Sequence, residues 1–269
     1  MKYAVNFHSS FNHMDTIDEM IIKYENDKQR AGLLNYMQQK VRDDLRIIIA
    51  AENLETIEGR DIETFIAVQE IHPNFAVRLG LCHKDIISDF VNNEIPFFFD
   101  VFIDSWDMLN GIIQSGVSDV YIANELGFHL PRIKKISKDV KIRVFPNVAQ
   151  STDKLHVLPT ISSFFIRPED IDCYEEYIDV CEFFGPADRH NVLYEIYTKG
   201  KWIGDLKELI IGLKINCPNI NIVHYFGEKR VNCKKSCSTG GFCNLCNQVC
   251  SLANSMQEKG LELKKDDEH

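Results

Sequence analysis

The chain has 269 residues, of which 45% are hydrophobic, so it can bury a large core as one barrel-sized domain or as two smaller ones. Its formal net charge of -10 argues against broad, sequence-independent binding to a phosphate backbone, which depends on clustered lysine and arginine. No apolar stretch approaches the length of about 18 residues that spans a bilayer, and the opening sequence MKYAVNFHSS lacks the pattern of a secretory signal. We therefore expect no membrane crossing and a cytoplasmic location.

Short β-branched and aromatic runs alternate with amphipathic stretches, a pattern typical of parallel strands joined by covering helices. Nine runs are predicted as strands: residues 3–8, 46–52, 75–81, 95–102, 119–125, 141–148, 163–167, 192–198 and 220–226. The predicted helices are residues 62–71, 84–93, 106–114, 132–137, 171–183 and 203–213, and residues 14–41 form a longer first connection. Asp61 and the pair Asp104 and Ser105 are expected to cap two of these helices.

Several predicted strands are apolar at successive positions, which is expected when both faces of a sheet are covered. Eight such strands would close a barrel, so the sequence predicts the α/β class and a (β/α)8 TIM-like barrel over residues 1–228. Cysteine, lysine and glycine rise together after Gly227, which indicates a small cysteine-rich, metal-binding C-terminal appendage over residues 229–256. Residues 257–269 are strongly charged and lack aromatic side chains, so we expect a disordered tail.

Five of the nine cysteines lie close together in the predicted appendage, with the spacing Cys233-x3-Cys237-x5-Cys243-x2-Cys246-x3-Cys250. Zinc ions and iron-sulfur clusters both require four converging thiolates, and cysteine pairs two or three residues apart supply two ligands from one turn. The expected ligands are Cys233, Cys237, Cys243 and Cys246, with Cys250 as a substitute ligand or a free thiol. The alternative is a set of reduced thiols or disulfides, and disulfides are disfavoured in a reducing compartment.

The remaining cysteines, Cys82, Cys173, Cys181 and Cys217, are scattered and are expected to be core thiols. Basic residues flank the first clustered pair and would offset thiolate charge or simply be solvated; any nucleic-acid partner would bind only through this local rim. The rim consists of Lys229, Arg230, Lys234 and Lys235.

In a barrel of parallel strands, chemistry is located where the strands end, so polar residues at those positions are the site candidates. The candidates are Glu52, Asp100, Asn124, Glu125, Arg143, Asn147, Arg167, Glu169, Glu195 and Tyr197. Each could instead cap the next helix or pair with a neighbour. His8 and His224 lie on strand-like runs and are expected to be core residues more often than ligands. The sequence has no Gly-rich phosphate loop and no G-x-S-x-G or His-Glu-x-x-His motif.

From Pro96 to about Asp170 the chain resembles the collagenase-like peptidase family, on the runs GVSDVYIANELGFHLPRIKKI, KIRVFPNVAQ and FFIRPEDI. Glu125, Leu126, Gly127, Gln150, Arg167 and Glu169 match family positions. The resemblance implies a barrel protein related to iron-sulfur enzymes that hydroxylate transfer RNA or ubiquinone precursors. The chain departs from the family at YEIYTKGKW, which lacks the family's His-Gly pair and following cysteines, and its cysteines gather later.

Two functions follow. The first is an oxidative modification enzyme acting on RNA or a small molecule, in which the cysteines hold an iron-sulfur cluster, Arg143 and Arg167 orient an anionic group, and Asp100, Glu125 or Glu195 transfers protons. The second is a non-catalytic binding or assembly protein in which the cysteines hold a structural zinc ion. No pattern in the sequence indicates the substrate or the oligomeric state.

Overall fold

The computed structural model describes residues 1–7, 12–24, 32, 34–35, 42–123, 126–148, 166–204 and 206–211. The strands within these ranges are β1 (Lys2–Asn6), β2 (Glu19–Lys23), β3 (Arg46–Ala50), β4 (Phe75–Leu79), β5 (Phe97–Phe99), β6 (Phe102–Ile103), β7 (Asp119–Ile122), β8 (Lys141–Val144) and β9 (Val180–Glu182). The α-helices are α2 (Gly59–Ile71), α3 (Ile87–Asn92), α4 (Trp106–Gln114), α5 (Leu130–Ile136), α6 (His190–Lys199) and α7 (Leu206–Leu209). Short 3-10 helices are η1 (Leu81–Ile86), η2 (Gly127–His129), η3 (Pro168–Tyr174) and η4 (Ala187–Arg189).

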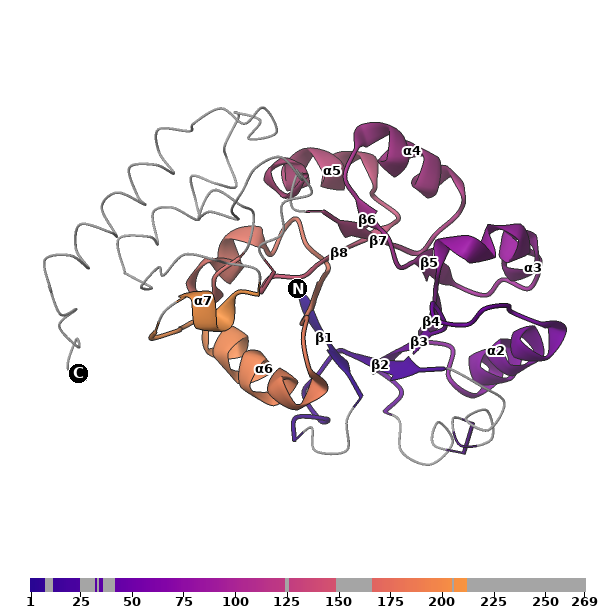
Figure 1. Cartoon of the computed structure of the whole chain (residues 1–269), viewed down its shortest axis with the longest axis horizontal. Coiled ribbons are helices and arrows are strands. Elements are labelled where there is room, and N and C mark those ends of the chain that lie inside the picture. Colours follow the sequence, from indigo (N-terminus) through magenta and orange to yellow (C-terminus); the bar gives the residue numbers. More distant parts are fainter. Residues whose placement is uncertain are drawn as a thin grey trace, which may run out of the picture.

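All nine strands belong to one parallel sheet with the order β5-β4-β3-β2-β1-β9-β8-β7-β6. The two ends of this order, β5 and β6, are separated along the chain by only Asp100 and Val101. The Ser118 N–H donates to the Phe97 carbonyl at 2.8 Å, which links the start of β7 to β5. Figure 1 shows the strands curving around a common centre with helices α2 to α6 outside them. The sheet is therefore curled and barrel-like.

Both faces of the sheet are covered. Every residue of β3, β4, β7 and β9 is buried, including charged ones. On the outer side, Phe97 of β5 contacts Phe90 of α3, which in turn contacts Phe65 of α2, at centroid distances of 5.6 and 5.9 Å. Covering helices on the outside explain why the strands read as continuous apolar runs in the sequence. Among the described helices, none is long and apolar enough to cross a membrane.

Six predicted strands are confirmed at their cores, namely those that became β1, β3, β4, β5 with β6, β7 and β8. Two elements were predicted wrongly. Residues 192–198 were predicted as a strand but lie in helix α6, and residues 171–183 were predicted as a helix but contain the end of η3 and strand β9. Strand β2 lies inside the predicted long connection and was missed. Predicted strand 220–226 and residues 163–165 lie outside the described residues.

Four of the predicted helices correspond to helical segments, and the prediction for residues 203–213 is met in part by α7. The two expected caps differ in detail. Ser105 occupies the N-cap position of α4 but makes no capping hydrogen bond through its side chain. Asp61 lies in the first turn of α2 and accepts a hydrogen bond from the Glu58 N–H at 2.8 Å, so it reaches back to the cap instead of being the cap. Cys181 is buried as expected, whereas Cys82 is exposed.

Gly80 follows β4 and allows it to lie close to the segment after β3. A Cβ atom at this position would be 2.9 Å from the Glu52 carbonyl oxygen, a backbone atom that cannot easily move away. We predict that Gly80→Ala lowers the free energy of unfolding by about 1–3 kcal/mol, measured by urea denaturation. Gly111→Ala in helix α4 is the matched control, because nothing lies within 4 Å of its Cβ position. It should raise stability by about 0.5–1 kcal/mol, and equal effects of the two changes would contradict the close approach.

Candidate functional site

Charged side chains from strands on different sides of the sheet meet in its interior. Arg46 of β3 binds Asp119 of β7 through two hydrogen bonds of 2.7 Å and also contacts Glu19 of β2 at 3.2 Å. All three side chains are buried. Glu19, Arg46 and Asp119 are the first residues of their strands, and their side chains lie on the inner face of the sheet. Residues at every second position along each strand point to this same face.

Arg143 of β8 lies at the centre of this group. Its guanidinium donates to Glu19 at 2.7 Å, to Asp119 at 3.0 Å and to Glu182 of β9 at 3.1 Å, and its side chain is completely buried. It also lies 5.1 Å from the centre of the Phe98 ring, a distance that permits a cation-π interaction. Arg143 therefore joins four strands from the inside.

Arg78 of β4 continues the network toward the carboxyl ends of the strands. It donates to Glu182 at 2.9 Å, to both oxygens of Glu52 at 2.8 and 3.3 Å, and to the Tyr121 hydroxyl at 3.1 Å. The Tyr121 hydroxyl in turn donates to Glu182 at 2.6 Å. Arg46, Arg143 and Arg78, with the carboxylates between them, form what we call the interior ion network.

Burial and charge act in opposite directions on the pKa values of this network. Burial raises the pKa of Asp119, but the hydrogen bonds and charge of Arg46, together with the charge of Arg143, lower it by a larger amount. The pKa of Asp119 therefore lies well below its usual value. Burial likewise raises the pKa of Glu182, and Arg78 and Arg143 outweigh this effect, so its pKa is lowered. Both carboxylates are therefore ionised at neutral pH.

The carboxyl ends of the strands form a mouth above this network. Glu52 follows β3, and Asp100 lies in the interruption between β5 and β6. Asp100 is exposed, and among the described residues its carboxylate has no hydrogen-bond or ion-pair partner. Its pKa is raised above the usual value chiefly because the carboxyl is partly desolvated; the charge of Arg78 lowers the pKa, and the charges of Glu52 and Glu182 raise it. A carboxylate with a raised pKa at a mouth is a candidate general acid or base.

Aromatic rings line another part of the same mouth. Phe145, after β8, stacks on Tyr121 at 5.3 Å and contacts Phe102 and Phe184, each at 5.5 Å. Phe102 and Phe184 remain 39% and 43% exposed. Asn147 fixes the Phe184 backbone by donating to its carbonyl at 2.8 Å and accepting from its N–H at 3.0 Å. The mouth thus combines a charged part with an aromatic part.

The predicted site residues fall into different surroundings. Asp100 lies at the mouth, Arg143 lies inside the interior ion network, and Arg167 is buried against Asp170 through two contacts of 2.6 Å. Glu195 lies on helix α6, where it contacts His13 and Lys199, so the strand end on which its selection rested does not exist. Glu125 and the predicted metal ligands Cys233, Cys237, Cys243 and Cys246 lie outside the described residues. Within the described part of the chain, no group of three or more His, Cys, Asp or Glu side chains could hold a metal ion.

Sequence reasoning missed Arg78, Tyr121 and Glu182, which link the network to the mouth. Arg78 and Tyr121 lie in the middle of predicted strands, whereas the site candidates were polar residues at the ends of predicted strands. Glu182 lies on β9, which was predicted as part of a helix. A charged residue inside an otherwise apolar strand was the signal that could have found Arg78.

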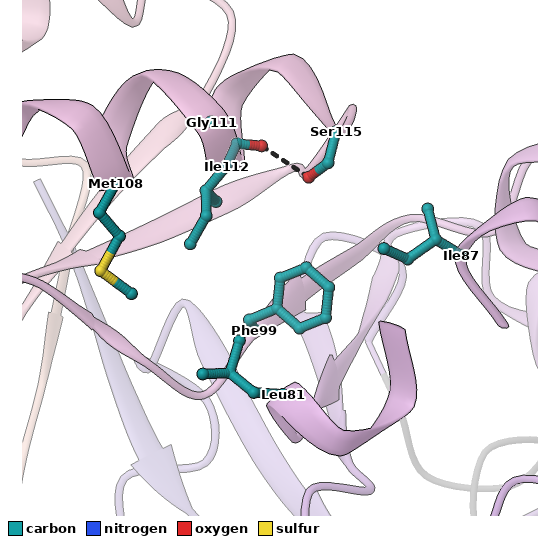
Figure 2. A pocket seen from close by; sticks show the side chains of 7 residues that line it. All are labelled: Leu81, Ile87, Phe99, Met108, Gly111, Ile112 and Ser115. Carbon is teal, nitrogen blue, oxygen red and sulfur yellow. Dashed lines mark hydrogen bonds between the residues drawn. The ribbon is translucent and has the colours of Figure 1, made fainter. Parts of the chain in front are cut away.

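A separate cavity of about 350 Å³ lies on the outer side of the sheet, between η1 with α3 and helix α4. Figure 2 shows Phe99 of β5 between Leu81 and Ile87 on one side and Met108 and Ile112 on the other. The Ser115 hydroxyl at its edge donates to the Ile112 carbonyl at 2.7 Å. The wall is almost entirely apolar, so it offers little to orient a polar ligand.

The described part of the chain is thus an α/β protein with a curled, barrel-like parallel sheet and a polar mouth at the carboxyl ends of its strands. No protein-family model and no curated protein matches the sequence.

Two solved structures are similar at a low level. One is the 4-hydroxy-2-oxoglutarate aldolase/2-deydro-3-deoxyphosphogluconate aldolase from TTHB1, with 8% identity, a TM-score of 0.41, and coverage of 74% of this chain and 92% of that one. The other is a cube-shaped protein cage designed by fusing symmetric oligomeric domains, with 10% identity, a TM-score of 0.43, and coverage of 98% and 87%.

The raised pKa of Asp100 gives a prediction for this site. A ¹³C NMR titration of the Asp100 side-chain carboxyl carbon should give a midpoint above the ordinary value of 3.8, because partial desolvation and neighbouring carboxylates disfavour the charged form. Glu52→Gln removes one of these negative charges and should lower the midpoint toward 3.8. A midpoint at or below 3.8 in the unmodified protein would contradict the desolvated site.

Proposed function

We propose that this protein binds a metal ion or an iron-sulfur cluster through Cys233, Cys237, Cys243 and Cys246. The observation that carries the proposal is the cysteine spacing, in which five of nine cysteines fall between Cys233 and Cys250. Such a set supplies the four thiolates that zinc and iron-sulfur sites require.

We further propose that the curled sheet closes completely as a (β/α)8 barrel, with the cysteine-rich segment as a C-terminal appendage. Closure is supported by the position of β5 and β6, which end the strand order yet follow each other in the chain. The Ser118–Phe97 hydrogen bond and the ion pair that joins Arg46 to Asp119 across the interior support it as well. In a closed barrel, the mouth described above is the face on which ligands bind.

The first candidate activity is an oxidative modification of RNA or of a small molecule, as a divergent member of the collagenase-like peptidase family. In this proposal the thiolates hold an iron-sulfur cluster, which supplies the redox chemistry. The residues of the mouth bind the substrate: the Glu52 carboxylate, held by Arg78, accepts hydrogen bonds from its polar groups, and Asp100 accepts or donates a proton. The exposed rings of Phe102 and Phe184 support this proposal because they offer an apolar surface beside the charged groups.

The second candidate is a non-catalytic binding or assembly protein with a structural zinc ion. It is favoured by the absence of a His-Gly pair in YEIYTKGKW. It is also favoured by Arg143 and Arg167, two proposed substrate ligands that are engaged by carboxylates of the protein itself. In this alternative, zinc stabilises the C-terminal segment, and the mouth binds a ligand without changing it.

Anaerobic purification followed by metal analysis tests the proposal. We expect bound iron with sulfide, or bound zinc, and loss of the metal in Cys243→Ser and Cys246→Ser because each removes one of four thiolate ligands. Cys82→Ser is the matched control, since Cys82 is an exposed free cysteine outside the cluster, and it should retain the metal.

The form of the metal separates the two candidates. A brown protein with broad visible absorption supports the oxidative enzyme, whereas a colourless protein that releases zinc to a chelator supports the structural alternative. Protein that contains neither metal, or that keeps its metal in Cys243→Ser and Cys246→Ser, would refute the assigned ligands.

A further inference from the structure

A second cavity, of about 460 Å³, lies at the mouth of the curled sheet. Asn6 and Phe7 at the end of β1 line it, as does Lys23 at the end of β2. The opposite wall is the segment from Gly185 to Ala187, which follows β9 and leads into η4. Ligands of parallel α/β sheets bind at the carboxyl ends of the strands, and this cavity occupies that position.

Strand geometry directs Lys23 toward the interior side of the sheet. Glu19 of the same strand is in the interior ion network, and Lys23, four residues later, points to the same side. Lys23 pairs with Ala50 of β3, and Ala50 pairs with Arg78 of β4, so the three residues share one side at the carboxyl ends of their strands. The cavity therefore opens beside the charged part of the mouth.

Charge decides which ligand fits this cavity. Lys23 is the charged side chain among its described lining residues, and no described residue forms an ion pair with it. No carboxylate appears among those lining residues, although acidic residues outnumber basic residues 40 to 30 in the chain. A cationic group at a partly enclosed surface favours an anion, because its charge is not already compensated by the protein.

The rest of the wall is largely apolar. Phe7 is 41% exposed, and Ile22 and Pro186 contribute further apolar surface. The Asn6 side chain adds an amide that can donate to an oxygen atom. This combination suits a ligand with an apolar ring or chain and one oxyanion group.

We propose that this cavity, which we call the anion pocket, binds an organic anion through its phosphate or carboxylate group, with Lys23 and Asn6 on the oxyanion and Phe7 against the apolar part. No residue of the anion pocket belongs to the cysteine cluster, so the proposal is independent of the metal. The anion pocket lies at the same carboxyl-end face of the sheet as Glu52, Arg78 and Asp100, so it would set the substrate class of the mouth.

Three probes with the same ring test the sign of the charge: phenyl phosphate, benzoate and benzylammonium. Titration of the full chain, followed by backbone amide NMR, should give shifts that saturate at Asn6, Phe7, Lys23 and Ala187 with an anionic probe. Phenyl phosphate and benzoate together show which oxyanion is preferred. Benzylammonium should leave these amides unchanged.

Lys23→Ala should weaken binding of the preferred anion at least about tenfold, because it removes a charge-assisted hydrogen bond, and Lys23→Arg should retain most of the affinity. Lys2→Ala is the matched control, an exposed lysine at the opposite end of β1, and should bind as the unmodified protein does. The proposal is overturned if neither anion shifts these amides, if benzylammonium shifts them equally, or if Lys23→Ala binds like Lys2→Ala. Amide spectra of each variant without probe establish that it is folded. If Lys23→Arg keeps the affinity that Lys23→Ala loses, the loss comes from the missing positive charge and not from a change in the structure.

Discussion

Three buried arginines tie strands from opposite parts of the curled sheet to one another through the interior ion network. Arg46, Arg78 and Arg143 connect carboxylates from strands that lie far apart along the chain, in a space that most barrels fill with aliphatic side chains. Removing charges from water is costly, and the attraction between them compensates only when hydrogen bonds are well formed on all sides. Here most of the buried charged atoms are paired, and Arg143 Nε is a buried donor with no hydrogen-bond partner among the described residues. Strand register and charge pairing must therefore be correct together.

The network also determines the chemistry of the mouth. Arg78 is bound by Glu182 below and Glu52 above, so its charge is largely compensated before any ligand arrives. Asp100 has no such direct partner in the described part of the chain, and its pKa is raised. Lys23 supplies a positive charge on another part of the rim. In the functions proposed above, the mouth separates a proton-transfer group, Asp100, from an anion-binding group, Lys23.

Local sequence pattern was sufficient for strands such as β3, whose sequence RIIIA is apolar and short, and for helix α4, predicted at its observed bounds. It failed for α6, because HNVLYEIYTK is rich in residues that favour strands and only packing against the sheet makes it helical. It also failed for β9, three residues whose pairing partners lie far away in sequence. The pairing within the interior ion network could not be predicted for the same reason: Arg46 and Asp119 meet only once the sheet has curled.

The measurement that tests the central role of the network most directly is the free energy of unfolding of three variants in urea. Arg46→Met leaves Asp119 short of its principal partner in the interior and should cost about 3–5 kcal/mol, whereas Arg46→Met combined with Asp119→Leu leaves Glu19 paired with Arg143 and should recover most of that loss. Arg60→Met, at an exposed pair with Glu58, should change stability by less than about 1 kcal/mol. A loss for Arg46→Met no larger than that for Arg60→Met would contradict a stabilising role for the interior ion network.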